Sequence, residues 1–161
     1  MAVHAFIFPG QGSQAVGMGR ELAQAFAIAR ETLEEVDDAL GQKLSQVLFE
    51  GPEADLTLTE NAQPALMAVS VAVARVLAQQ GGLPLADPAT RDQVRFVAGH
   101  SLGEYSALCV AGTFSLADTA RLLKRRGQAM QAAVPVAMVE VVAEVVEVVY
   151  APALVYQFQP V

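Results

Sequence analysis

Hydrophobic and polar residues follow one another in blocks that predict alternating strands and helices. Residues 3–8 form a short apolar run that stops at Pro9-Gly10, and residues 93–98 form a second such run. Short apolar runs bounded by turn residues are typical of buried parallel strands. Between them, apolar residues recur every three or four positions over residues 18–39, opposite a face of acidic residues. This pattern predicts one amphipathic helix that ends at Gly41.

A more apolar helix is predicted over residues 64–80. Proline suits the first position of a helix, which Pro64 would occupy, and the glycines at 81 and 82 suit its end. The segment has no broad polar face, so we expect this helix to be deeply buried. A short helix with a polar connection is predicted before it, over residues 43–62, and a loop after it, over residues 81–91.

Two further helices are predicted over residues 102–110 and 115–132. The second opens with a capping box from Ser115 to Asp118. Strands that alternate with helices predict an α/β fold, with a parallel sheet covered by helices on both faces. A chain of 161 residues is long enough for one such core.

The end of the chain differs from the rest in composition. Residues 137–149 are almost entirely valine, glutamate and alanine. The glutamates at 140, 144 and 147 would share one helical face, whereas the valines favour a strand, and both structures remain open. The sequence therefore predicts a domain over residues 1–135 and a low-complexity tail of undecided structure over residues 136–161.

The composition favours a folded protein with acidic character. Hydrophobic residues make up 53% of the chain, charged residues 17%, and the formal net charge is −7. Such a charge repels polyanions, which argues against nucleic acid or an anionic membrane surface as a partner. The exception is a basic cluster formed by Arg121, Lys124, Arg125 and Arg126. This cluster is the candidate anion site, and a solvated helix face is the alternative interpretation.

Cysteine and hydropathy point to a soluble protein of a reducing compartment. Cys109 is the sole cysteine, so no internal disulfide can form. The N-terminus lacks the basic start of a secretory signal, and no stretch of the chain has the roughly 18–20 consecutive apolar residues of a membrane span. We expect a cytoplasmic protein with no membrane partner and no metal site, in which Cys109 and Met130 are packing residues.

The strongest chemical motif is Gly99-His100-Ser101-Leu102-Gly103. It matches the G-x-S-x-G pattern and has the context that this pattern requires, a short apolar strand before it and a helix after it. On such a turn the serine hydroxyl projects outward, and the start of the helix offers a positive dipole and free N–H groups to an oxyanion. Ser101 is therefore a candidate nucleophile; a turn serine that caps a helix is the alternative.

A second motif, PGQGSQ at residues 9–14, follows the first predicted strand. Ligands of open α/β sheets bind at the carboxyl ends of strands, so this loop can present Gln11 to a site there. The spacing of Gly10, Gly12 and Ala15 also fits a loose dinucleotide-binding pattern. That alternative needs an acidic residue after a second strand about 20 residues on, where we predict a helix instead.

In combination, these residues resemble the malonyl-CoA:acyl carrier protein transacylase family. The similar segments, which fall within residues 3–135, are FPGQGSQ at 8–14, QPAL at 63–66, GHSLGEYSAL at 99–108, and RG with MQ at 126–131. The resemblance implies an α/β-hydrolase-like core with a ferredoxin-like subdomain inserted after the helix that carries RG. It also implies an acyltransferase of fatty-acid synthesis that uses no cofactor. Malonyl-CoA would acylate Ser101, and the phosphopantetheine thiol of acyl carrier protein would then take the malonyl group.

The resemblance assigns roles to four other residues. The backbone N–H groups of Gln11 and Leu102 would form the oxyanion hole. Arg126 would bind the malonyl carboxylate with two hydrogen bonds, a task for which lysine is a poor substitute, and Gln63 would line the same site. Leucine at position 102 resembles malonyl-selective members of the family. In the alternative interpretation, Arg126 simply ends a basic helix, where cations are favoured.

The chain also departs from the family pattern. The family's general base is a histidine far downstream, and neither His4 nor His100 matches its position. The resemblance therefore implies a truncated core, with little or none of the small subdomain, which turns over very slowly alone. Two other functions remain open: a serine hydrolase or thioesterase on the same turn, and a non-catalytic module that binds acyl-CoA or serves as a scaffold.

Overall fold

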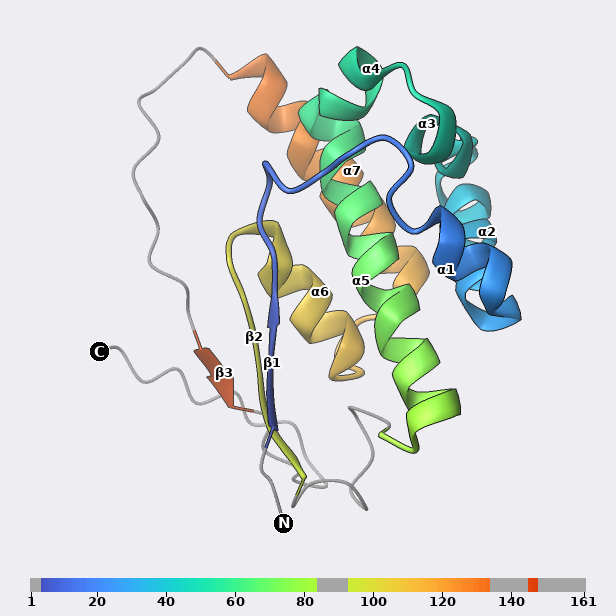
Figure 1. Cartoon of the computed structure of the whole chain (residues 1–161). Helices are drawn as coiled ribbons and strands as arrows, with labels where there is room; N and C mark the ends of the chain where they lie inside the picture. The colour runs from blue at the N-terminus through green and yellow to red at the C-terminus, as the bar shows by residue number, and fades with distance from the viewer. Residues whose placement is uncertain (1–3, 84–92, 134–144, 148–161) are drawn as a thin grey trace.

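A computed structural model describes residues 4–83, 93–133 and 145–147. Within them the fold has a small sheet on one side and a group of helices on the other (Figure 1). The greater part of the predicted loop over 81–91 and all of the predicted tail except 145–147 lie outside the described residues.

Two strands of the sheet are parallel, as the hydrophobic pattern predicted. They are β1 (His4–Phe8) and β2 (Val94–Gly99), and their register pairs Phe8 with Gly99. The third strand, β3 (Val145–Glu147), pairs with the other edge of β2 in the antiparallel direction. The predicted parallel sheet is confirmed by β1 and β2, and β3 lies in the tail, for which the sequence left helix and strand open. Valine content favours a strand there, but local sequence does not determine pairing direction.

Seven helices are present in the described residues, and together they cover one face of the sheet. They are α1 (Arg20–Ala25), α2 (Ala27–Leu40), α3 (Leu44–Glu50), α4 (Glu53–Thr57), α5 (Thr59–Gly81), α6 (Leu102–Val110) and α7 (Leu116–Ala132). α6 packs directly on β1 and β2, α5 and α7 lie on the side of α6 away from the sheet, and α1 to α4 lie farther out (Figure 1). The expected cover on both faces is not found among these residues, and the side chain of Ile7 on β1 is 78% exposed.

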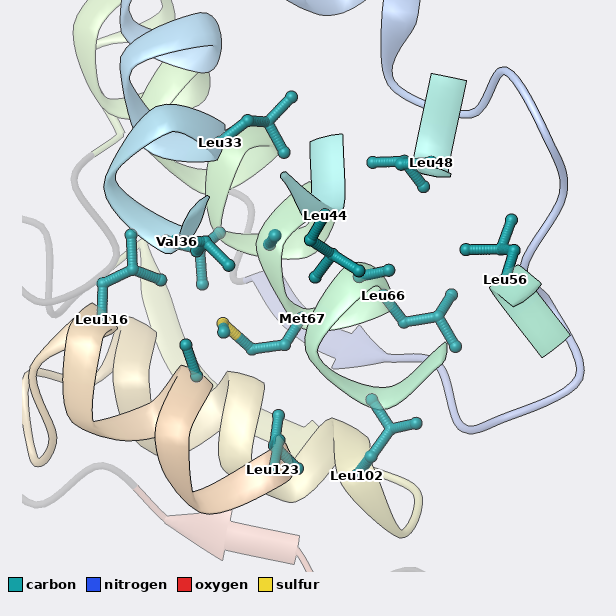
Figure 2. Close-up of a cluster of buried hydrophobic side chains, with 14 of the residues drawn as sticks. Leu33, Val36, Leu44, Leu48, Leu56, Leu66, Met67, Leu102, Leu116 and Leu123 are labelled. Atoms are coloured by element: carbon teal, nitrogen blue, oxygen red, sulfur yellow. The ribbon is translucent and has the colours of Figure 1, made fainter. Parts of the chain in front are cut away.

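The main core lies between α5 and the helices around it. Met67 of α5 is fully buried in this core, and leucines from five other helices surround it (Figure 2). A smaller cluster around Phe8 and Val97 joins the sheet to α6. As predicted, α5 is deeply buried, although Val73 on its outer side is 42% exposed. α5 is also long and apolar enough to cross a membrane, but 67% of that stretch is buried in the fold, and core helices pass the same test.

The predicted helix over residues 18–39 is in fact two helices. α1 ends and α2 begins at Phe26, whose backbone is extended with φ −129° and ψ 121°. Phe26 packs against a separate cluster of Ala29, Ala72 and Val76. Long-range packing accounts for the break, which the three- and four-residue spacing of apolar side chains could not indicate. The end of α2 at Gly41, in the left-handed conformation, was predicted correctly.

α5 begins five residues earlier than predicted, so Pro64 lies inside the helix and not at its first position. The additional turn contains Asn61 and Gln63, polar residues that are nevertheless buried. Asn61 donates to the carbonyl of Asp55 at 2.9 Å, and Gln63 bonds to side chains of α7. These partners come from other elements, which explains why helix signals in the local sequence missed the turn. The predicted end is correct, since Gly82 caps α5 in the left-handed conformation.

The helices after β2 follow the sequence closely. α6 has the predicted bounds, and α7 starts one residue after the predicted Ser115, which is its N-cap. Ser115 Oγ accepts a hydrogen bond from the backbone N–H of Asp118 at 3.0 Å, as expected of a cap. These two helices position the residues of the candidate site.

Candidate active site

Ser101 lies on a sharp bend between β2 and α6. Its backbone has φ 55° and ψ −110°, and it is the only non-glycine residue with positive φ in the described part of the chain. Such a conformation is costly for a residue with a Cβ, and it occurs at functional turns. The bend is that of a nucleophile elbow, with the serine between a parallel strand and a helix.

The two glycines of the motif allow the elbow to close. A Cβ atom on Gly99 would overlap the backbone of Gly103, and a Cβ on Gly103 would overlap the carbonyl of Phe8 at the end of β1. The first turn of α6 is thus pressed against the ends of both parallel strands, and any side chain at these positions would separate them. Both glycines of the motif are therefore required by the backbone contacts of the elbow.

The loop after β1 lies beside this elbow. The backbone N–H of His100 donates to the carbonyl of Phe8 at 3.2 Å, and a Cβ on Gly10 would overlap the imidazole of His100. Gln11 follows in this loop, where its exposed side chain donates to Thr59 Oγ1 at 3.2 Å. The loop is therefore held between the elbow and the start of α5. This places Gln11 next to the segment that carries Ser101.

A chain of hydrogen bonds links Ser101 to α5 and α7. Arg126 of α7 donates from Nη2 to Ser101 Oγ at 3.0 Å and from Nη1 to Gln63 Oε1 at 2.7 Å. The amide nitrogen of Gln63 donates in turn to Met130 Sδ at 3.2 Å. The structure thus brings together three residues that are far apart in the sequence, Ser101, Arg126 and Gln63. Their catalytic and binding roles remain predictions.

The environment of Arg126 suits the binding of an anion. Its guanidinium carbon lies 5.8 Å from the centre of the Tyr105 ring, at the distance of a cation–π contact. Among the described residues it contacts the neutral side chains of Ser101, Gln63 and Tyr105, with no carboxylate among these partners. A half-buried guanidinium whose partners are neutral keeps its charge available to a carboxylate.

Leu102 and the histidines also have defined positions. Leu102 is the first residue of α6, and its side chain is fully buried in the main core (Figure 2). The first N–H groups of a helix have no intrahelical acceptor, which leaves them available to a developing negative charge. His4 lies at the start of β1, and His100 packs on Gly10; the hydrogen bond found at Ser101 Oγ comes from Arg126.

The basic cluster of α7 does not act as one anion site. Arg121 is exposed and pairs with Asp118 at 3.3 Å. Lys124 is only 20% exposed and pairs with Glu60 of α5 at 3.0 Å. Only Arg126 turns toward Ser101. Neither proposed interpretation, a single anion site or a solvated helix face, describes all four residues, because the helix distributes them over different faces.

Three residues that contact the candidate site residues are not identified by the sequence motifs: Tyr105, which contacts Arg126, Met130, which bonds to Gln63, and Thr59, which bonds to Gln11. Tyr105 lies four residues after Ser101 and Met130 four residues after Arg126, so helical spacing alone could have placed each on the same side of its helix as a candidate site residue. No comparable signal exists for Thr59, since its bond to Gln11 joins residues 48 positions apart.

Two other site types find no support. The dinucleotide-binding alternative needs a second strand before an acidic residue, but residues 31–38 lie in α2 and the next strand is β2. No group of three or more His, Cys, Asp or Glu residues with the arrangement of a metal site occurs within the described residues.

The fold and the site define a class: α/β proteins that carry a serine on a nucleophile elbow. Comparison with known proteins narrows this class. The family described as "Acyl transferase domain" matches residues 5–156, and the chain belongs to this family.

Relatives of known structure and sequence agree with this assignment. The chain is 46% identical over 135 residues to the malonyl CoA-acyl carrier protein transacylase of Bacillus subtilis (strain 168), covering 84% of this chain and 39% of the relative. It superposes with a TM-score of 0.76 on the crystal structure of an acyl-carrier-protein-S-malonyltransferase from Bartonella henselae, at 64% identity over 84% of this chain and 41% of the other.

A third match is a malonyl-transacylase solved in complex with the acyl-carrier protein of a type II PKS. The TM-score is 0.74 and the identity 43%, over 83% of this chain and 40% of the other. The chain therefore spans about two fifths of the length of the relatives it matches.

Proposed function

We propose that this chain carries the acyl-accepting serine of a malonyl-CoA:acyl carrier protein transacylase. The observation that supports this most directly is the contact of Arg126 Nη2 with Ser101 Oγ at 3.0 Å. A cation within hydrogen-bond reach of a nucleophile suits an acyl group that ends in a carboxylate. A simple ester or an acetyl group would make no use of it.

In the proposed reaction, Ser101 Oγ attacks the thioester carbon of malonyl-CoA. A general base takes the hydroxyl proton, which is passed to the sulfur of coenzyme A as the C–S bond breaks. The product is a malonyl ester on Ser101. The phosphopantetheine thiol of acyl carrier protein then attacks this ester, so that a C–S bond forms, the C–O bond breaks and the proton returns to Ser101. The general base of this proposal is not among the residues described.

Arg126 would change partners during the reaction. Its two Nη atoms now donate to Ser101 Oγ and Gln63 Oε1. A malonyl carboxylate arriving between them would take these donors as a bidentate acceptor, which frees the serine hydroxyl for attack. Gln63 would remain beside the guanidinium, because its amide is fully buried and also bonds to Met130.

The backbone N–H groups of Gln11 and Leu102 would stabilise the negative oxygen of the tetrahedral intermediate. Leu102 begins α6 directly after the nucleophile, and Gln11 lies in the loop that packs on His100. Donors fixed by rigid backbone need no rearrangement as charge develops. Loss of one such donor typically costs about 100- to 1,000-fold in rate.

The partners proposed are malonyl-CoA and acyl carrier protein, in fatty-acid synthesis in the cytoplasm, with no cofactor. A relative was solved with an acyl-carrier protein bound, which supports that partner for this chain. The single cysteine, Cys109, fits a reducing compartment.

Intact-protein mass spectrometry after incubation with malonyl-CoA tests the proposal. We expect a slowly forming malonyl adduct on the wild-type chain and none on Ser101→Ala. Release of the adduct by phosphopantetheinylated acyl carrier protein would identify a transferase. Turnover of simple esters without an adduct would instead indicate a hydrolase or thioesterase. If neither an adduct nor ester turnover is observed, a binding or scaffolding module is the remaining interpretation. Either result would contradict the proposal.

A further inference from the structure

A second group of polar contacts between α5 and α7 lies one helical turn from the site and has no part in the chemistry described above. At its centre is Glu60, in the first turn of α5. Three α7 side chains bond to it: Lys124 at 3.0 Å and Gln128 at 3.1 Å reach its carboxylate, and Gln131 Oε1 accepts from its backbone N–H at 2.8 Å. We call these four residues the Glu60 junction.

The geometry points to the Glu60 junction as the device that positions Arg126 against Ser101, an inference that rests on the proposed function for its consequence in catalysis. Lys124, Gln128 and Gln131 are spaced at four and three residues, so they form one stripe of α7. Arg126 and Met130 form the neighbouring stripe, and both contact Gln63. Gln63 itself lies three residues after Glu60 on α5. The two helices thus meet twice within one turn, once at Glu60 and once at Gln63.

Between the stripes the helix backbones touch. A Cβ on Gly127 would lie 2.7 Å from both the Glu60 nitrogen and the Thr59 carbonyl oxygen, closer than real Cβ contacts permit. Gly127 directly follows Arg126 in the sequence. The backbone contact at Gly127 sets the distance between α5 and α7, and the Glu60 junction restricts sliding and rotation of α7 against α5. Together they determine how far the guanidinium reaches.

Lys124 is fully engaged in this contact. Besides Glu60, it donates to Gln42 Oε1 at 2.9 Å and Asn61 Oδ1 at 3.0 Å, so its three ammonium hydrogens have three acceptors. It is therefore unavailable to a substrate carboxylate, and its charge is balanced by Glu60. Arg126 is left as the cation that faces Ser101 in this part of the chain.

Small displacements at the Glu60 junction have large consequences at the site. The Arg126 bonds of 2.7 and 3.0 Å lie within the normal range of about 2.7–3.2 Å for N–H···O bonds. A movement of α7 by about 0.5 Å, the usual tolerance of a functional site, takes the longer bond outside that range. Loss of Glu60 should thus weaken recognition of a carboxylate more than it weakens acylation in general.

The test compares Glu60→Ala with Glu35→Ala. Glu35 pairs with Arg75 at 2.7 Å and joins α2 to α5, which makes it a matched ion pair between helices in which neither partner is a site residue. The readout is the NMR signal of the Arg126 guanidinium in arginine-labelled protein, assigned with Arg126→Lys. We expect the signal to shift or broaden in Glu60→Ala and to stay in place in Glu35→Ala. In acylation of Ser101, we expect the preference for malonyl-CoA over acetyl-CoA to fall roughly five- to tenfold in Glu60→Ala alone.

The outcomes separate the two proposals. An unchanged Arg126 signal in Glu60→Ala overturns the inference whatever the activity, as does an equal loss of malonyl and acetyl transfer. If the signal shifts in Glu60→Ala but the wild-type chain shows no preference for malonyl-CoA, the positioning role is supported and the proposed function is contradicted. If Glu60→Ala does not fold, Gln131→Ala removes only the bond to the Glu60 N–H, and the same signal decides.

Discussion

Replacing Ser101 with glycine should stabilise the protein relative to replacing it with alanine, because Ser101 is the N-cap of α6 and its backbone has positive φ. Both variants lose the bond from Arg126 to the hydroxyl, so this loss cancels in the comparison. They differ in backbone freedom: at φ 55° and ψ −110°, alanine keeps the strain of a Cβ atom and glycine does not.

The size of the difference follows from two opposing terms. A non-glycine residue held in a sparsely populated region costs about 1–3 kcal/mol. Glycine costs about 0.4–1 kcal/mol through the greater freedom of the unfolded chain. The remainder favours Ser101→Gly by roughly 0.5–2 kcal/mol. For a chain of this length, about 1 kcal/mol corresponds to a shift of roughly 2–4 °C in melting temperature.

Thermal and urea unfolding followed by circular dichroism would measure this difference. A control is Ala129→Gly, at an exposed position of α7, where we expect a loss of up to about 1 kcal/mol because glycine weakens an ordinary helix. The sign should therefore reverse between the two positions. If Ser101→Gly proves no more stable than Ser101→Ala, the elbow is not strained, and the strain argument for the nucleophile is refuted.

Four other predictions follow from named contacts. Arg126→Ala should shift acylation from malonyl-CoA toward acetyl-CoA, and Arg126→Lys should not restore the preference because lysine lacks two parallel donors. In a competition assay, an unchanged ratio of malonyl to acetyl adducts would contradict the role of Arg126 in binding the malonyl carboxylate. Gly127→Ala should destabilise the fold by about 1–3 kcal/mol in urea unfolding, since its Cβ meets backbone atoms of α5. If the variant is as stable as the wild type, α5 and α7 can move apart without cost and the close contact is not required. Hydrogen bonds from Lys124 and then Gln128 lower the pKa of Glu60, so its contribution to stability should be complete above the ordinary pKa of 4.5 and be lost as the pH falls through the lowered pKa. Glu60→Gln should flatten this part of the curve of stability against pH. An unaltered curve would contradict the contribution of the Glu60 carboxylate to stability. Burial raises the pKa of the Cys109 thiol, so alkylation at pH 8 should be slower than that of a free cysteine, and equal rates would contradict the burial.

The residues around the nucleophile were predictable because their structure is local. The strand before Ser101, the turn, the bounds of α6 and the cap of α7 at Ser115 all depend on residues a few positions apart. Glycines at 99 and 103 are required by backbone contact at the elbow itself, which a five-residue motif can encode. The end of α2 at Gly41 and the cap of α5 at Gly82 depend in the same way on a residue that tolerates the left-handed conformation.

What the motifs could not supply is the geometry that joins them. Ser101 and Arg126 are 25 residues apart, Gln63 and Arg126 are 63 apart, and Glu60 and Gln131 are 71 apart. Family resemblance named three of these residues as neighbours, but composition and spacing did not indicate their distances or their order along one hydrogen-bonded chain.

The amino-acid sequence by itself determined the elements and the elbow, because backbone preference, capping and helical or strand periodicity act over a few residues. Only the tertiary structure decided the break at Phe26, the early start of α5, the helices on one face of the sheet and the antiparallel β3. Each of these depends on atoms brought together by packing. For the same reason only the fold could place Glu60 where its contacts with α7 set the position of Arg126.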